Sequence, residues 1–372
     1  MAQGLNFHVS RVPALDGIRG IAILLVFTFH MTPVLLLGGR IGVDLFFVLS
    51  GFLITWTLLQ EQRLTGSISL KNFYMRRILR LVPPLVTVIA FVMTFVWLKG
   101  TAEQISLAIW NSIGALLYFF NWQVVWEAPN VLNHERMYSH IWSLSVEEQF
   151  YTVWPLVVVG MFTFGAPRRA WLALALAGIF VPSVWRALRW LQEPSPLVYV
   201  QTHLRADGLM WGALAAILID LRIVPTGKLR KVASWAGVPA LLGLFVIASF
   251  EGLENGFFYL VGFALVGLCS SVLIYTSVVC PLPPLARALA FRPLRWIGGI
   301  SYGLYLWHWP IIRIVAGWEL PQVATIAAEY SISFAIATVS YYSMEQPILR
   351  LKKRFTPEIA PPLRDGALRF SA

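Results

Sequence analysis

Long apolar runs, separated by short polar segments, dominate the chain. Runs of roughly twenty residues with few charges are long enough to cross a bilayer as α-helices. Ten runs are predicted to be membrane spans, at about 14–36, 42–60, 82–98, 142–164, 171–191, 205–221, 232–250, 257–276, 297–316 and 324–343. Another run, 104–123, is interrupted by polar side chains such as Asn111 and Asn121. We expect that run to be re-entrant or half-crossing, since irregular backbone at membrane depth is tolerated where protein shields it.

The basic residues between the runs predict how the chain is oriented. Lys and Arg collect in cytoplasmic loops of membrane proteins. The basic segments are 61–81, 222–231, 281–296 and 350–354. A full crossing by 104–123 would place Arg168 and Arg169 outside, whereas a half-crossing places them inside. The expected fold is therefore an all-α, polytopic integral membrane helix bundle. It has about ten transmembrane helices plus one re-entrant or half-crossing segment, and both termini are cytoplasmic.

Composition agrees with a membrane protein. Of the 372 residues, 58% are hydrophobic and only 13% are charged, against about 25% charged in soluble domains. The net charge of +11 is explained by basic cytoplasmic loops, so nucleic acid is not an expected partner. The first run carries Arg19 and no A-x-A cleavage site follows it, so we interpret it as a retained span. Cys269 and Cys280 form neither a metal-binding spacing nor a disulfide framework, and no metal is expected.

The first run carries the sharpest candidate chemistry. Arg19 and His30 are eleven residues apart, which on an α-helix is ~16 Å of rise and three turns plus ~20°. Both side chains therefore project from one face of a helix that should be apolar, where ionisable groups are costly. Imidazole can accept a proton from a hydroxyl near neutral pH and return it. The alternatives are a histidine that only bonds a neighbouring helix and an Arg19 paired with Asp16 three residues earlier.

The basic segment after the second run offers a candidate anion site. Arg76, Arg77 and Arg80 lie on or near one helix face by i, i+3 and i, i+4 spacing. Guanidinium groups suit phosphates, although the same arginines could simply anchor the cytoplasmic side.

Acidic residues supply candidate orienting groups. Asp44, in the outer half of its run, could hold His30 or could cap its helix. Glu147 and Glu148 lie just inside the outer end of another run. We expect Glu147 to orient His30 or Arg19, and Glu148 to cap the helix start.

Several other residues have simpler interpretations. His308 lies in an aromatic belt and is more often structural in such a setting, while His140 falls in an outer loop and could meet an acceptor. Asp207 is expected to form a buried ion pair with Arg205. The Ser50-Gly51 pair is expected to let two helices approach closely, and we do not interpret Ser50 as a nucleophile.

Seven motifs, in order along the chain, resemble those of one family. They are LDGIRGIAILLVFTFH at 15–30, IGVDLFFVLSGFLI at 41–54, FYMRRILRLVPP at 73–84, HIWSLSVEEQFYTVWP at 140–155, LRADGLMWGALAA at 204–216, ISYGLYLWHWP at 300–310 and YYSMEQPIL at 341–349. The chain resembles the membrane-bound acyltransferase 3 family. The resemblance implies that Arg19 and His30 are an essential pair, with His30 acting at the acyl-transfer step. It also implies that the donor is acyl-CoA, here expected to be acetyl-CoA, approached from the cytoplasm.

The function expected from this resemblance is transfer of a short acyl group to a hydroxyl of a cell-surface glycan or its lipid-linked precursor, in a bacterial inner membrane. One alternative acceptor is a small glycosylated metabolite such as a macrolide. A different class, a membrane carrier or flippase, also suits ten spans with intramembrane charges, but no internal repeat is evident.

Some members of the family carry a C-terminal esterase-like domain. Only about twenty residues follow the last basic cluster here. We therefore expect a membrane domain over 1–349, a short basic cytoplasmic tail over 350–372 and no fused esterase-like domain. The chain would then complete the transfer itself or hand the acyl group to a separate extracytoplasmic partner.

Overall fold

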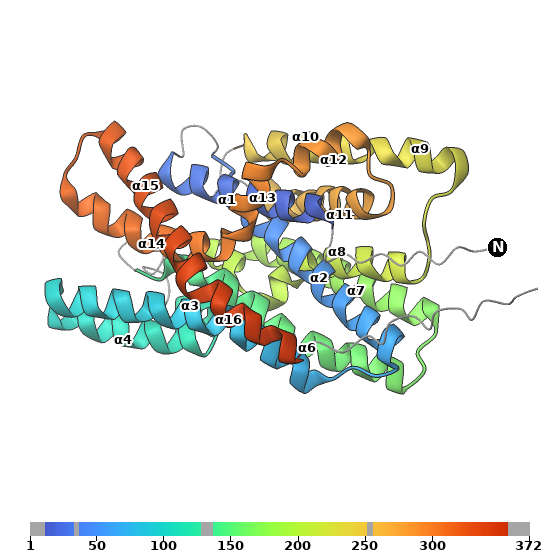
Figure 1. The fold of residues 1–372 in the computed structure, drawn as a ribbon, viewed down its shortest axis with the longest axis horizontal. Helices are drawn as coiled ribbons and strands as arrows, with labels where there is room; N and C mark the ends of the chain where they lie inside the picture. The colour runs from blue at the N-terminus through green and yellow to red at the C-terminus, as the bar shows by residue number, and fades with distance from the viewer. Residues whose placement is uncertain (1–11, 33–36, 128–136, 251–255, 356–372) are drawn as a thin grey trace, which may run out of the picture.

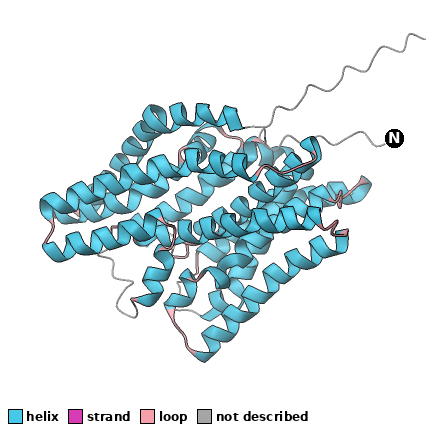
Figure 2. Cartoon of the chain, turned by 90° about the horizontal axis from the view of Figure 1, so that it is seen from below, coloured by secondary structure: helices cyan, strands magenta, loops and turns pink. Residues whose placement is uncertain are grey.

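A computed structural model of the protein describes residues 12–32, 37–127, 137–250 and 256–355. Within these ranges every regular element is helical, and the helices pack into one bundle (Figures 1 and 2). Seven helical segments are long and apolar enough to cross a membrane. The prediction of an all-α membrane bundle is thus confirmed.

The helices follow the predicted runs closely. In chain order they are α1 (Pro13–Met31), α2 (Ile41–Thr65), α3 (Leu70–Lys99), α4 (Ala102–Leu116), α5 (Phe120–Trp126), η2 (Ser139–Ile141), α6 (Trp142–Thr163), α7 (Arg168–Gln192), η3 (Pro196–Val200), α8 (Thr202–Asp220), α9 (Gly227–Trp235), α10 (Gly237–Ala248), η4 (Phe258–Gly262), α11 (Phe263–Val279), α12 (Pro283–Leu289), α13 (Arg292–Gly299), α14 (Ser301–Val315), η5 (Ala316–Trp318), α15 (Gln322–Ser340), η6 (Tyr341–Glu345), α16 (Gln346–Leu351) and η7 (Lys352–Phe355).

The seven candidate spans account for most of the ten predicted runs. They are α1, α2, α3, α7, the α9–α10 pair, η4 with α11, and α15 through α16. The other three runs correspond to α6, α8 and α13 with α14. The first predicted span extends to residue 36, but α1 ends at Met31, and residues 33–36 lie outside the described ranges. The interrupted run 104–123 forms two helices, α4 and α5, separated by a turn at Tyr118, whose φ of 53° ends the first helix.

Helix α2 is the centre of the bundle. It is buried along nearly its whole length and packs most extensively against α8. A Cβ on Gly51 would lie 1.9 Å from the backbone oxygen of Leu209, and one on Gly212 would lie 1.8 Å from that of Val48. The two backbones therefore touch, as small residues permit between membrane helices. The predicted close approach at Gly51 is confirmed.

The first half of α1 is fixed in the same way. A Cβ on Gly17 would lie 1.8 Å from the backbone oxygen of Leu289, and one on Gly298 would lie 1.8 Å from that of Asp16. On its other side α1 contacts α2, where a Cβ on Gly42 would lie 2.3 Å from the backbone of Ala22. These backbone contacts leave α1 little freedom to shift, and they set the position of the polar residues along it.

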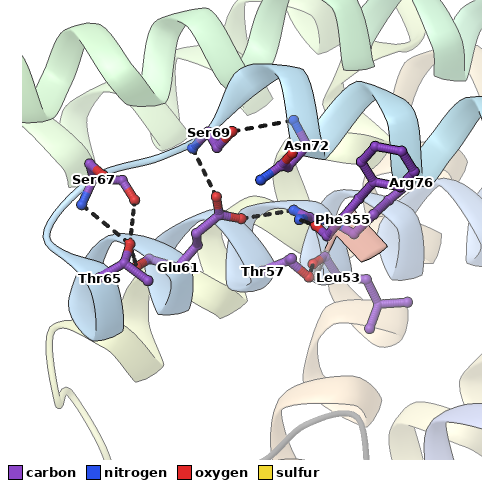
Figure 3. Close-up of polar contacts among 9 residues, drawn as sticks. All are labelled: Leu53, Thr57, Glu61, Thr65, Ser67, Ser69, Asn72, Arg76 and Phe355. Carbon is purple, nitrogen blue, oxygen red and sulfur yellow. Dashed lines mark hydrogen bonds and ion pairs between the residues drawn. The ribbon is translucent and has the colours of Figure 1, made fainter. Parts of the chain in front are cut away.

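A polar network joins the end of α2 to the start of α3 (Figure 3). Glu61 accepts a hydrogen bond from the backbone of Ser69 at 2.8 Å and forms an ion pair with Arg76 at 2.8 Å. Arg76 also donates to the backbone oxygen of Phe355 at 2.6 Å. The side chains of Arg76 and Glu61 are 8% and 4% exposed. This corrects the assignment of Arg76 to a donor phosphate site, because its guanidinium is buried between a carboxylate and a carbonyl.

Candidate active site

A cavity lies between α1, α2, α3, α6 and α14. It holds about 780 Å³ of empty space, a volume that includes the open solvent at its mouth. One wall is the apolar face of α2 from Val43 to Ile54, which spans ~16 Å along the helix. One end carries three arginines, and the other is bordered by Ser143 and Tyr305.

The three arginines of the cavity differ in how they are paired. Arg19 forms an ion pair with Asp16 at 2.9 Å, as the alternative interpretation of the sequence had it, and it also lines the cavity. Arg77 pairs with Glu148 at 2.9 Å and lies over the ring of Tyr151, 3.3 Å from its centroid.

Arg80 is the exception at this end of the cavity. It lines the cavity and is exposed to it. Within the described ranges it has no hydrogen bond or ion pair. Its guanidinium is therefore the cation of this site that is available to an anionic ligand.

Of the two acidic residues of α6, Glu148 has a different partner from the one expected, and Glu147 faces the cavity. Glu147 lines the cavity, accepts a hydrogen bond from the Tyr151 hydroxyl at 3.3 Å and has the Ser50 hydroxyl beside it. It lies in the field of Arg77 and Arg80, so it faces the basic end of the cavity, where Arg19 also lies. Glu148 pairs with Arg77 instead of capping α6.

Three histidines from different elements gather next to the far end of the cavity. His30 of α1 and His308 of α14 approach within 3.2 Å, Nδ1 to Nε2. The centroid of the His140 ring, in η2, lies 5.1 Å from the centroid of the His308 ring. The ring of Trp309 packs against those of His30 and His140, with distances of 5.0 and 6.5 Å between ring centroids. His140 and His308 are buried, and His30 is half-buried.

This cluster adjoins the cavity through one tyrosine. The Tyr305 hydroxyl lies 2.5 Å from the Ser143 hydroxyl and donates to the backbone oxygen of His140 at 2.7 Å. Both Tyr305 and Ser143 line the cavity. The basic residues and the histidines thus stand at opposite ends of one site, with Arg19 at the first end and His30 at the second.

The sequence did not link the three histidines. His308 was interpreted as structural and His140 as a loop residue, and neither was tied to His30. The only available signal was that His30 and His308 lie in the predicted outer halves of their runs and that His140 lies in the predicted outer loop. Which of those ends meet is decided by helix packing. Among the described residues, no group of three His, Cys, Asp or Glu side chains is arranged to hold a metal ion.

Asp44 is placed elsewhere than predicted. Its carboxylate forms a buried ion pair with Arg205 of α8, so it neither orients His30 nor caps α2. Asp207 in turn pairs with Arg186 at 2.8 Å, and not with its sequence neighbour Arg205. A buried guanidinium is costly in a low-dielectric interior unless a carboxylate pairs with it. Helix packing therefore decides which carboxylate each arginine contacts. These pairs tie α2, α7 and α8 together.

A further basic residue, Lys352 of η7, lies near the arginines of the cavity without lining the cavity itself. Lys352 follows the last candidate span and lies in the field of Arg80, Arg76, Arg77 and Arg19. Burial and these positive charges lower the pKa of Lys352 to about 8. Its ammonium group therefore loses its charge at a lower pH than an exposed lysine does, and a bound anion would stabilise the charged form.

Comparison with known proteins identifies the family. A family model described as an acyltransferase domain matches residues 12–344. The chain belongs to the acyltransferase 3 family. It is 31% identical over 358 residues to the peptidoglycan O-acetyltransferase OatA of Listeria monocytogenes, covering 94% of this chain and 57% of that protein. It is also 31% identical over 354 residues to the O-acetyltransferase OatA of Staphylococcus aureus, covering 91% and 57%.

The chain therefore spans little more than half the length of these curated relatives. No solved structure matches the chain.

The placement of Asp44 can be tested by stability. Asp44→Ala leaves Arg205 buried without its carboxylate, and we expect a loss of about 3–5 kcal/mol in unfolding free energy. Asp16→Ala removes a half-exposed partner of Arg19, and the expected loss is under about 1 kcal/mol. The measurement is unfolding of the purified protein in detergent. A fully stable but inactive Asp44→Ala would contradict the structural role and return Asp44 to the catalytic site.

Proposed function

We propose that this chain is a membrane O-acyltransferase that moves a short acyl group, acetyl, from acyl-CoA to a hydroxyl of a cell-surface glycan or its lipid-linked precursor. The observation that carries the proposal is one cavity with Arg80 at one end, which has no ion-pair partner among the described residues, and a pair of hydrogen-bonded histidines adjoining the other end. A donor with a polyanionic head and a distant reactive thioester matches such a site. The glycan acceptor is inferred from the names of the OatA relatives.

In this proposal the head of acyl-CoA is held at the basic end. Arg80 and Lys352 would take the phosphates, with Arg77 and Arg19 adding to the positive field. Arg76 is left out of this site because Glu61 already holds it. The pantetheine arm would follow the apolar wall of α2 and present the thioester near Tyr305 and His30.

The transfer step then needs one base at the far end. His30 takes the proton of the acceptor hydroxyl as its oxygen attacks the thioester carbonyl. The carbon–sulfur bond breaks, the ester forms, and the His30 imidazolium returns the proton to the departing thiolate. Arg19 lies at the basic end, which favours a role on the donor phosphates over one on the reacting carbonyl.

The same proposal includes the topology. Ten crossings with cytoplasmic termini would open the basic end of the cavity to the cytoplasm, where acyl-CoA is made available, and would leave the histidines toward the outer face. The α4–α5 break would be the half-crossing segment, shielded by α3, which α4 contacts, and by α6, which α5 contacts. The membrane would be the bacterial inner membrane.

The role of His30 separates an enzyme from a carrier. We expect His30→Ala and His30→Gln to lower acyl transfer by about 10²–10⁴-fold, because neither side chain can accept and return a proton near neutral pH. Binding of acyl-CoA should persist in both. Transfer of labelled acetyl in membranes is normalised to the amount of inserted protein. Substantial turnover by His30→Gln would refute the catalytic role, since glutamine preserves only hydrogen bonding.

Arg80 offers a direct test of the donor site. Removing its charge in Arg80→Ala should weaken acyl-CoA binding roughly ten- to hundredfold, as expected for the loss of a charge-assisted contact. Arg63→Ala is the matched control, since Arg63 pairs with Asp220 and does not line the cavity. Equilibrium binding to protein in lipid nanodiscs is the measurement. Equal affinities of the two variants would place the donor elsewhere.

Lys352 predicts a pH dependence of donor binding. With its pKa near 8, the side chain is charged below that pH and neutral above it. Acyl-CoA affinity should therefore fall as the pH rises from 7 to 9. Lys352→Arg should abolish this fall because guanidinium stays charged, and Lys352→Ala should bind weakly at both pH values. A wild-type affinity that does not change over this range would exclude Lys352 from the donor site.

A further inference from the structure

The pair formed by His30 and His308 carries a second inference, which rests on the proposed function. We propose that His308 is a positioning residue that holds His30 in the tautomer with hydrogen on Nδ1. The lone pair that accepts the proton of the acceptor hydroxyl then lies on Nε2 of His30. Three contacts fix this assignment.

The first contact sets the tautomer of His308. Its Nδ1 lies 2.6 Å from the backbone oxygen of Tyr305. A carbonyl oxygen only accepts hydrogen bonds, so Nδ1 of His308 must carry a hydrogen. The side chain is fully buried and pairs with no carboxylate among the described residues. A charged imidazole in such a place would be costly, so His308 is neutral and its Nε2 bears a lone pair.

The second contact passes this constraint to His30. The Nε2 of His308 lies 3.2 Å from Nδ1 of His30. Two lone pairs cannot form a hydrogen bond, so Nδ1 of His30 must be the donor. A neutral imidazole carries one hydrogen, and Nε2 of His30 is therefore its basic nitrogen. A base held in one tautomer spends no time in the form that presents a hydrogen to the acceptor.

The third set of contacts keeps the rings in place. Phe27 packs against His308 at 5.3 Å between ring centroids, and Trp309 packs against His30 at 5.0 Å. The ring of His140 packs edge-on against the ring of His308, with an angle of 73° between the two ring planes. The ring of His140 forms no hydrogen bond to His308 within the described ranges, so His140 does not compete with His30 for Nε2 of His308. Through His308 the histidine pair is thus fixed to the backbone of α14.

Two substitutions of His308 test the contacts of its two ring nitrogens separately. In His308→Asn the side-chain amide can keep the bond to Tyr305 but cannot reach His30. In His308→Gln the amide oxygen can reach the position of Nε2 and accept from His30. We expect kcat to fall about 10- to 100-fold in His308→Asn, with an unchanged KM for acyl-CoA. We expect His308→Gln to recover to within about threefold of the wild type.

A control and a second readout make the test decisive. His203→Gln alters a histidine that stacks on Trp122 away from the cluster, and it should leave kcat unchanged. Solid-state ¹⁵N NMR of histidine-labelled protein in lipid, assigned by difference with His30→Gln, should show His30 as the Nδ1–H tautomer. In His308→Asn the His30 signal should become a mixture of tautomers.

Equal kcat values for His308→Asn and His308→Gln would overturn the positioning role. So would a wild-type His30 that carries its hydrogen on Nε2. If the wild-type protein transfers no acyl group at all, the proposed function fails, while the tautomer measurement still decides the state of the histidine pair.

Discussion

The cost of burying a charge in a low-dielectric interior governs which polar groups of this bundle hold it together and which are available for chemistry. Arg186, Arg205 and Arg76 are each buried against a carboxylate, on Asp207, Asp44 and Glu61. Each of these pairs connects two helices and leaves its cation unavailable to a ligand. Arg80, in contrast, faces the cavity without an ion-pair partner in the described part of the chain. The division between structural and functional arginines is therefore a consequence of where the carboxylates are.

Direct contact between helix backbones is the second feature that fixes the bundle. Glycines bring α2 against α8 and α1 against α12 and α13, so that these helices cannot slide without atomic overlap. Such rigid walls suit a reaction that needs a thioester and a hydroxyl to meet within a few tenths of an ångström. His30 lies on one of these fixed helices, α1, and its partner His308 lies on α14.

Much of this architecture was readable in the sequence. The apolar runs located the long helices, because a chain in lipid must satisfy its backbone within each helix. The polar interruption near Asn121 marked the break between α4 and α5. Arg19 and His30 also lie on one helix, α1, as the first run predicted. Local pattern and helical periodicity suffice for such features, since each concerns a single helix.

What the sequence alone could not decide was which side chains meet across helices. It assigned Arg76 to the donor site, Asp44 to His30 and Asp207 to Arg205, and the structure pairs them with Glu61, Arg205 and Arg186. Nothing in the sequence indicated that His140 and His308 lie beside His30. A helix fixes the face on which a residue lies, but the partner on that face depends on the rotation and depth of the neighbouring helix. In this bundle those are set by glycine contacts between segments far apart in the chain, such as Gly51 with Leu209, and they become visible only once the helices are packed.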